Sequence, residues 1–568
     1  MTAAPVATPV DAGGGSSGGP PVSSGPGSSP SRGRPRGRGG AAAMLVALGI
    51  LLTRVFGLVR SRVMARYLGT SDAADVFTSA LRIPNFLQNL FGEGVLSASF
   101  IPVYARLLAE GDEEEADRVA GAVFGILGAT IATLVALGVL ATPLFVGTIA
   151  SGFTGAKREL TIDLVRILFP GTGLLVLSAW CLGILNSHRK FFLSYTAPVL
   201  WNVAIILGLV LEARAGLRGG RLVERVAWWT VAGCVLQFAV QVPTVLRLLG
   251  RFRPSIDTQC EHVREVVKNF VPVFVGRGAV QISAYVDLNF ASQLGSGAQA
   301  ALGYAQAIYL LPVGLFGMSI SAAELPAMSG TLGTEEQVHT QLRDRLSAGL
   351  RRIAFFVIPS AMAFLALGDV IAATLFQSGA FKHATSVFVW GILAGSAVGL
   401  LASTLARLYS STFYALKDTR TPLRFALVRI VLSIVLGWLF AFPLPKLLGI
   451  APGWGVAGLT ASAGVAGWVE FALLRSRLNH RIGRTGVPAK LTAGLWLAAA
   501  LAAACAWGIK LYVGLERPLL SGRGPAILAM YCLVYFLSTY VADVPESHEI
   551  MRRIARARPR PVAPTPPA

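Results

Sequence analysis

The chain has 568 residues, of which 54% are hydrophobic and only 14% are charged, and its formal net charge is +21. Soluble globular proteins carry about 25% charged residues, so the composition excludes an ordinary soluble protein and indicates a polytopic membrane protein. Most Lys and Arg residues lie in short segments between apolar runs, which favours membrane topology and anionic lipid over nucleic acid as the reason for the basic charge. The five cysteines show no metal-ligand spacing, and we expect free thiols.

Both ends of the chain are basic and of low complexity. Residues 1–43 are rich in Gly, Ser and Pro and end in a run of arginines, and residues 551–568 contain five Arg followed by a Pro-rich stretch. This composition predicts disordered tails, for which we favour a solvated, topology-setting role over lipid binding. The apolar run that starts at residue 44 continues into a full span, so we expect no signal peptide.

Apolar runs of roughly 20 residues, long enough to cross a bilayer, recur along the rest of the chain. We therefore expect an all-α integral membrane protein with about fourteen transmembrane helices. They cover residues 44–66, 77–105, 119–148, 160–186, 192–212, 226–249, 267–292, 301–329, 348–376, 385–414, 423–445, 453–474, 489–513 and 523–543. Pro84 predicts a break within the second span.

The loops between these spans predict the orientation of the chain. With the N-terminus inside, the inner loops hold about 21 Lys and Arg residues and the outer loops about 10. This bias follows the positive-inside rule, and an even number of spans places the C-terminus inside as well. We expect a multi-pass protein of the cytoplasmic (inner) membrane with both termini in the cytoplasm. The basic loop at residues 214–225 is the exception, because it falls outside in this scheme.

A short motif recurs in the two halves of the chain. Leu90-Phe91-Gly92 runs on to Pro102, and Leu315-Phe316-Gly317 runs on to Pro326, about 225 residues later. Each copy lies in the second helix of a six-helix block. Repeated halves are typical of secondary transporters, whose substrate site lies between them. The pattern predicts an N-terminal bundle at residues 44–250 and a C-terminal bundle at residues 266–477.

The first two expected spans carry many charges for membrane segments. A charged side chain at the bilayer centre costs about 2.5–3.5 kcal/mol on insertion scales, so such charges are expected to face a wet cavity or one another. In the second span, the helical step of 100° places four polar side chains within about 40° of one face. They are Asp75, Arg82, Asn89 and Glu93. In the first span, Arg54 lies deep, whereas Arg62 and Arg66 lie near a helix end.

Two interpretations of these charges stay open. In the first, Asp75 and Glu93 neutralise nearby arginines in an ion-paired helix hairpin, and nothing binds there. In the second, which we favour, surplus positive charge lines a polar cavity that holds an anion, because the planar guanidinium forms paired hydrogen bonds with phosphate. The arginines concerned are Arg54, Arg60 and Arg82.

Three acidic residues in the C-terminal half are further candidates. Asp287 and Glu324 lie inside apolar spans, where a carboxylate either binds a coupling cation or proton or bonds to a neighbouring helix. Asp418 lies in the segment YALKDTRTPLR at an inner loop, where we favour a helix cap or an ion pair with Arg420.

Motifs for other classes of chemistry are absent from the sequence. It has no GxxxxGK[ST] motif for ATP, no HExxH motif and no cluster of Cys and His for a metal. It also lacks the clustered loop carboxylates with which a membrane glycosyltransferase would hold a metal diphosphate. We therefore expect a transport protein without a cofactor, and no enzyme.

Several segments resemble the MurJ/MviN lipid II flippase family, which belongs to the multidrug/oligosaccharidyl-lipid/polysaccharide exporter group. The similarity covers about residues 44–540. It is carried by TRVFGLVRSRVMARYLG (53–69), SDAADVF (71–77), RIPNFLQNLFGEGVLSASFIPVY (82–104), NFVPVFVGRGAVQISAYVD (269–287), YLLPVGLFG and AELP (309–326) and FYALKDTRTP (413–422). The resemblance implies two six-helix bundles arranged in a V, with residues 489–543 as two extra helices that form a groove for the lipid tail.

The resemblance also implies roles for particular residues. Arg54 and Arg60 match cavity arginines of the family, and Asp75 and Glu93 match its acidic positions. Some relatives bind sodium in the C-terminal half, which makes Asp287 and Asp418 candidates for a cation site.

The chain departs from the family's pattern at two places. Gln88-Asn89 stands where many members have a basic pair, and Gln306-Ala307 stands where some have Asp-Arg. We expect Arg82 to compensate, so that the anion site depends mainly on the N-terminal half.

The function implied by the resemblance is the flipping of lipid II, the undecaprenyl-pyrophosphate-linked peptidoglycan precursor, to the outer leaflet by alternating access. Membrane potential or a sodium or proton gradient would drive the cycle, and other cell-wall synthesis proteins are candidate partners. Two alternatives stay open: export of another lipid-linked oligosaccharide or amphiphile, and a non-transporting scaffold for wall synthesis.

Overall fold

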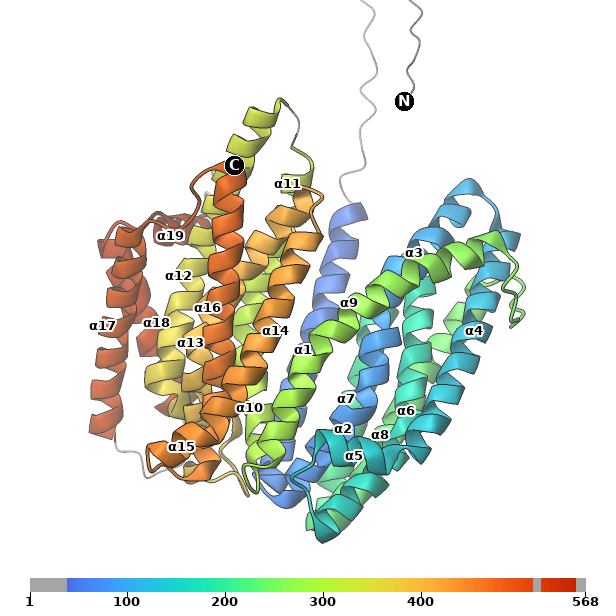
Figure 1. Ribbon diagram of the computed structural model, residues 1–568, viewed down its shortest axis with the longest axis horizontal. Helices are drawn as coiled ribbons and strands as arrows, with labels where there is room; N and C mark the ends of the chain where they lie inside the picture. The colour runs from blue at the N-terminus through green and yellow to red at the C-terminus, as the bar shows by residue number, and fades with distance from the viewer. Residues whose placement is uncertain (1–37, 332, 514–522, 558–568) are drawn as a thin grey trace, which may run out of the picture.

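The computed structural model describes residues 38–331, 333–513 and 523–557, and their regular elements are helices joined by short turns. Within these ranges, one isolated β-bridge pairs Ser378 with Phe381. The helices gather into two lobes that meet at one end of the molecule and splay apart at the other (Figure 1). The predicted all-α membrane architecture is confirmed.

The N-terminal lobe contains the first eight helices. They are α1 (Arg38–Leu68), α2 (Asp72–Phe91), α3 (Glu93–Glu110), α4 (Glu113–Leu140), α5 (Thr142–Ile149), α6 (Gly155–Ser187), α7 (Phe191–Arg214) and α8 (Gly219–Leu248). The C-terminal lobe follows, with a π-helical turn η1 and a 3₁₀ turn η2 between its longer helices. Its elements are α9 (Glu261–Ser292), α10 (Ala298–Pro312), η1 (Val313–Met318), α11 (Ser319–Ser329), α12 (Glu335–Phe376), α13 (His383–Ala415), α14 (Arg420–Ala441), α15 (Pro443–Leu447), η2 (Pro452–Trp454) and α16 (Gly455–Ile482).

Three further helices pack on the outside of the C-terminal lobe. They are α17 (Ala489–Val513), α18 (Arg523–Val541) and α19 (Pro545–Ala557). The hydroxyls of Tyr531 and Tyr535 on α18 each donate a 2.7 Å hydrogen bond to a backbone carbonyl of α12. On α17, the Lys510 ammonium forms a buried ion pair of 2.7 Å with Asp369 of α12. The pair of helices predicted at residues 489–543 is therefore fixed on α12.

Eleven helical segments are both long enough and apolar enough to cross a membrane, as judged by length and composition over the described residues. Fourteen spans were expected, and the other three coincide with α1, with α2 and α3 together, and with α9. These three segments carry the charged residues considered below. Such charges must face polar surroundings rather than lipid, as they do in a helix that lines a cavity.

The two described ends of the chain, Arg38 and Ala557, lie at the same end of the molecule, which we call the terminal end (Figure 1). The lobes splay apart there and come together at the opposite end, which we call the far end. Helix α9 crosses between them, from the N-terminal lobe at the terminal end to the C-terminal lobe at the far end (Figure 1). Val263 and Val266 in its first turns are buried in the core formed by α3, α4 and α6.

The expected helix break at Pro84 is wrong. α2 continues through Pro84 and ends at Phe91, and Gly92 separates it from α3. A proline within a membrane helix is tolerated where neighbouring groups satisfy the freed carbonyl. The break falls on the repeated Leu-Phe-Gly motif, and the second copy lies inside the π-helical turn η1. Both halves therefore interrupt their second helix at the same motif, which supports the predicted internal repeat.

Candidate functional site

Two arginines line a polar cavity between the lobes. Arg60 of α1 and Arg82 of α2 face a space of about 250 Å³. Helices α6, α7 and α8 of the N-terminal lobe form its other walls on that side. On the side of the C-terminal lobe, the cavity is closed by Ala300, Gly303 and Tyr304 of α10. The cavity therefore changes shape whenever the two lobes move relative to each other.

The Arg60 guanidinium is buried without a full set of hydrogen-bond partners. Its Nε and Nη1 atoms are buried and have no hydrogen-bond partner among the described residues. The group lies 4.8 Å from the centre of the Trp201 ring, which fixes its plane by a cation–π contact. Leaving a buried charged donor unsatisfied is costly. An anion bound in this cavity would pair with the positive charge and accept hydrogen bonds from the free N–H groups.

Arg82 also faces a second cavity, of about 410 Å³, on the side of the C-terminal lobe. Tyr285 of α9 donates a 3.0 Å hydrogen bond to the backbone carbonyl of Arg82 and so ties the two lobes together at this point. Asp287 lies in this cavity. Its other lining groups include hydroxyls of α9, α10, α13, α14 and α16 and the guanidinium of Arg429, which is paired with Glu470 at 3.2 Å.

Arg54 lies apart from both cavities. It is exposed on α1, and its guanidinium packs against Gly314 of η1, where a β-carbon would come within 3.0 Å of Nη1. Arg54 therefore contacts the interrupted helix of the C-terminal lobe, next to the second Leu-Phe-Gly motif. Two residues beyond Arg60, Arg62 donates a 3.4 Å hydrogen bond to the carbonyl of Thr374 in α12.

Asp75 joins the two lobes at the far end. Its side chain is fully buried, and its Oδ1 accepts a hydrogen bond of 2.9 Å from the backbone nitrogen of Ala300. Its Oδ2 accepts one of 2.7 Å from the backbone nitrogen of Gly297 and lies 2.8 Å from the Lys157 ammonium. The carboxylate thus caps the N-terminus of α10, where the helix dipole and the free N–H groups favour an anion.

The contacts around Asp75 form a polar layer that we call the far-end gate. Lys157 also pairs with Asp72 at 2.6 Å, and the Tyr304 hydroxyl donates a 3.0 Å hydrogen bond to the carbonyl of Gly69. Close by, Ser79 bonds with Gln299 across the lobes. For Asp75, the ion-paired interpretation therefore holds, although its partner is a lysine of α6 and no arginine.

The expected stripe of four polar residues on one helix does not exist as a single face. The break at Gly92 places Glu93 at the start of α3, where it is exposed. Asn89 is partly buried in the last turns of α2 and lines neither cavity. Of the four residues, the structure brings Arg82 to the cavity together with Arg60, and it places Asp75 in the far-end gate.

Sequence reasoning missed Arg277 of α9. Its guanidinium rests against Gly94, where any β-carbon would collide with it, and it is close enough to Glu93 for electrostatic interaction. An arginine inside an apolar span was a signal that could have found it. Arg277 supplies positive charge at the start of α3, a few residues after Gln88-Asn89, where the chain departs from the basic pair of the resembled family.

Asp418 and Asp287 do not form one site. Asp418 lies in the loop between α13 and α14, where it accepts hydrogen bonds from the backbone nitrogen and hydroxyl of Thr421, at 3.0 and 2.9 Å. These hydrogen bonds lower the pKa of the Asp418 carboxyl. Its ion pair, at 3.4 Å, is with Arg481, whereas Arg420 was expected. Glu324, the other candidate, lies 3.6 Å from Arg352 and 3.9 Å from Arg345.

Comparison with known proteins decides the family. The model of the family described as "Lipid II flippase MurJ" matches residues 64–516. The chain belongs to the lipid II flippase MurJ family. It is 30% identical over 469 residues to "Probable lipid II flippase MurJ" of Rhizobium meliloti (strain 1021), covering 80% of this chain and 84% of the relative. It is 31% identical over 448 residues to "Lipid II flippase MurJ" of Burkholderia cenocepacia, covering 77% and 84%.

Solved structures share the fold. One described as "Lipid II flippase MurJ, inward closed conformation" has a TM-score of 0.73 at 24% identity and covers 90% of this chain and 100% of its own. An inward-facing multidrug resistance MATE family transporter of the MOP superfamily has a TM-score of 0.58 at 18% identity, over 77% of this chain and 98% of its own. The protein is thus a multi-pass membrane protein with a transporter fold.

Proposed function

We propose that the protein flips lipid II, the undecaprenyl-pyrophosphate-linked peptidoglycan precursor, from the inner to the outer leaflet of the cytoplasmic membrane. Family membership supports the cargo. The observation that carries the proposal is the buried guanidinium of Arg60, which has no protein partner and lies in a cavity between two lobes. A diphosphate supplies the planar pairs of acceptor oxygens that such a group binds best.

Arg60 and Arg82 hold the pyrophosphate in this proposal, and Arg54 and Arg277 supply positive potential along the path. The cavity of about 250 Å³ is large enough for the diphosphate but not for the whole lipid. The sugar and peptide therefore extend towards the splayed terminal end, and the prenyl chain stays in the lipid beside the protein. Asn89 and Glu93 lie at the break between α2 and α3, where they contact the moving headgroup.

The terminal end faces the cytoplasm in this proposal. The loops at that end carry the larger share of Lys and Arg, and the positive-inside rule assigns such loops to the cytoplasm. The structure is then open towards the cytoplasm and closed at the far-end gate. Release to the outer leaflet requires the lobes to rock, so that the contacts of Asp75 with α10 separate.

Asp287 is our candidate for coupling to a cation or proton gradient. It lies in the second cavity beside Arg82 and among hydroxyl groups, where the arrival of a cation changes the charge next to the diphosphate site. Asp418 has no part in this site, because its carboxylate is occupied at the α13–α14 loop. Replacing Asp287 with Asn should make transport insensitive to the imposed ion gradient while binding of the cargo persists.

The direct test is translocation of lipid II by the purified protein in proteoliposomes, with and without imposed gradients. Arg60→Ala should lower transport about tenfold or more and should prevent rescue of a cell depleted of its own flippase. Rescue by a stably expressed Arg60→Ala variant would favour the non-transporting scaffold. Failure of the unmodified protein to move lipid II, with transport of another lipid-linked oligosaccharide, would favour the alternative cargo.

A further inference from the structure

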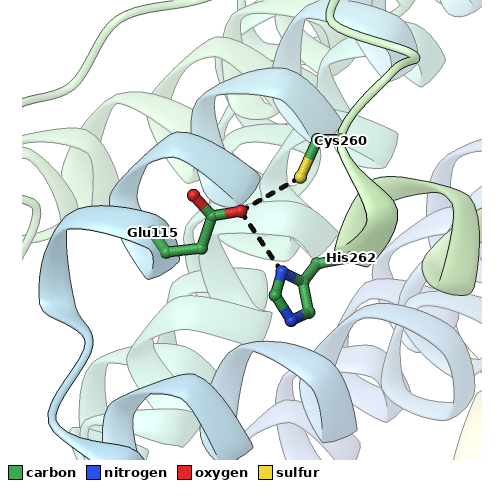
Figure 2. A group of neighbouring side chains, drawn as sticks. All are labelled: Glu115, Cys260 and His262. Carbon is green, nitrogen blue, oxygen red and sulfur yellow. Dashed lines mark hydrogen bonds and ion pairs between the residues drawn. The ribbon is translucent and has the colours of Figure 1, made fainter.

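Three potential metal ligands converge at the terminal end of the N-terminal lobe, away from the cavities. They come from two segments: Glu115 lies in the first turn of α4, Cys260 precedes α9, and His262 lies in its first turn (Figure 2). Oε1 of Glu115 lies 3.1 Å from the sulfur of Cys260 and 3.2 Å from Nδ1 of His262. The three ligand atoms all lie within 4.8 Å of one another.

The chemistry of this set matches that of zinc sites. Thiolate, imidazole and carboxylate are the three ligand types of Zn²⁺, with bonds of about 2.0–2.3 Å. Tetrahedral angles then separate neighbouring ligand atoms by roughly 3.3–3.7 Å. The separations from Oε1 are within a few tenths of an ångström of this range, and the remaining pair of ligand atoms lies within 4.8 Å, so side-chain rotations can bring all three onto one ion. Cys260 is buried, whereas His262 and Glu115 are partly exposed, which leaves a side open for water as the fourth ligand.

The surroundings hold the three ligands in place. Asp257 accepts hydrogen bonds from the backbone nitrogens of Gln259 and Cys260, at 2.9 and 3.3 Å, and so fixes the turn that carries the thiol. Its other oxygen pairs at 2.7 Å with Arg118, whose guanidinium also lies 3.7 Å from the second oxygen of Glu115. Arg118 is therefore already neutralised, and its charge opposes a metal ion less than an unpaired arginine would. Such outer contacts orient ligands in metal sites.

We propose that Glu115, Cys260 and His262 bind a divalent ion of the zinc class. The ion would fasten the start of α9 to the start of α4, both of which already pack in the same core. Glu115 is 145 residues from Cys260 in the chain, which explains why the sequence showed no cluster of metal ligands. Because α9 is the helix that crosses between the lobes, the ion would stiffen its N-terminal anchor; this consequence, unlike the binding itself, rests on the proposed function.

The test is metal binding by the full-length protein purified in detergent, with Co²⁺ as a spectroscopic probe. We expect a sulfur-to-cobalt charge-transfer band that Zn²⁺ displaces. Cys260→Ser should abolish the band, and His262→Ala or Glu115→Gln should weaken Co²⁺ binding about tenfold or more. The control variants are Cys505→Ser and His339→Ala, which change a cysteine and a histidine outside the cluster and should leave the band unchanged.

A second measurement keeps the proposal testable if a variant folds poorly. In the unmodified protein, Zn²⁺ should slow alkylation of Cys260 about tenfold or more, as read by mass spectrometry of that peptide, and should not slow alkylation of Cys505. A missing cobalt band, or a band that persists in Cys260→Ser, would overturn the site. Neither measurement involves lipid II, so a failure here is separate from a failure of the transport proposal.

Discussion

Asp75 of α2 accepts a 2.7 Å hydrogen bond from the backbone nitrogen of Gly297, the residue that precedes α10 in the opposite lobe. Its pairing with Lys157 makes this the most deeply buried charge contact of the far-end gate. The carboxylate therefore belongs to the closure of the far end, and its separation from α10 is a necessary step in opening it.

Asp75→Asn should weaken the gate and destabilise the protein by about 1–3 kcal/mol, because Lys157 loses a buried partner and the α10 cap loses its charge. Thermal unfolding in detergent measures the loss. Asp72→Asn is the matched control, because it removes the other partner of Lys157. The Asp72 side chain is 62% exposed, so its loss should cost less than about 1 kcal/mol. Equal losses for the two variants would contradict the role given to Asp75.

Arg60→Ala should separate function from stability. Because no protein group bonds to its buried Nε and Nη1, we expect unchanged or slightly higher thermal stability. Transport of lipid II should fall about tenfold or more, since a hydrogen bond to a charged group contributes about 1.5–3 kcal/mol. Arg166→Ala, at an exposed position of α6, serves as the control and should leave both quantities unchanged. A large loss of stability in Arg60→Ala would indicate a structural arginine.

Gly399→Ala should destabilise the C-terminal lobe by about 1–3 kcal/mol. Helices α13 and α16 touch backbone to backbone here, and a β-carbon on Gly399 would collide with the main chain of Gly464. A collision with backbone is not relieved by a side-chain rotation. Gly494→Ala in α17 meets open space and should be neutral or stabilising, because alanine favours helix. Comparing the two melting temperatures tests the prediction.

Asp418→Asn should lower stability at neutral pH by about 1 kcal/mol, because Thr421 and Arg481 lose a charged acceptor. The folded-state pKa of Asp418 lies below its ordinary value, so the contribution of the carboxylate is present above that value and disappears as the pH falls through the folded-state pKa. The melting temperatures of the two proteins should therefore converge at acidic pH. A constant difference across the pH range would refute a charge-based cap.

The spans were predictable because hydropathy is a property of consecutive residues. The position of the helix break was not predictable, since Pro84 is a stronger local signal for a break than Gly92. The packing of neighbouring elements decides at which of the two residues the helix breaks. The cavity could be predicted in part: Arg60 and Arg82 were named, and both face it.

Contacts between residues that lie far apart in the chain could not be predicted from the sequence. Asp75 meets a lysine 82 residues away, and its cap is on a helix of the other lobe. Helical projection treated Glu93 as part of the same helix as Asp75, because a single glycine gives no firm indication that a helix ends. The contact of Arg277 with Gly94 was not predictable, because it depends on how α9 packs against α3.

The course of α9 has a mechanical consequence. This helix has 32 residues and so measures about 48 Å, with its start buried in the core of one lobe and its far end seated in the other. When the lobes rock, a helix of fixed length can stay packed in both lobes only if it bends or if one of its ends slides. The curvature of α9 should therefore change during the transport cycle. The distance between two spin labels placed at its ends would measure that change.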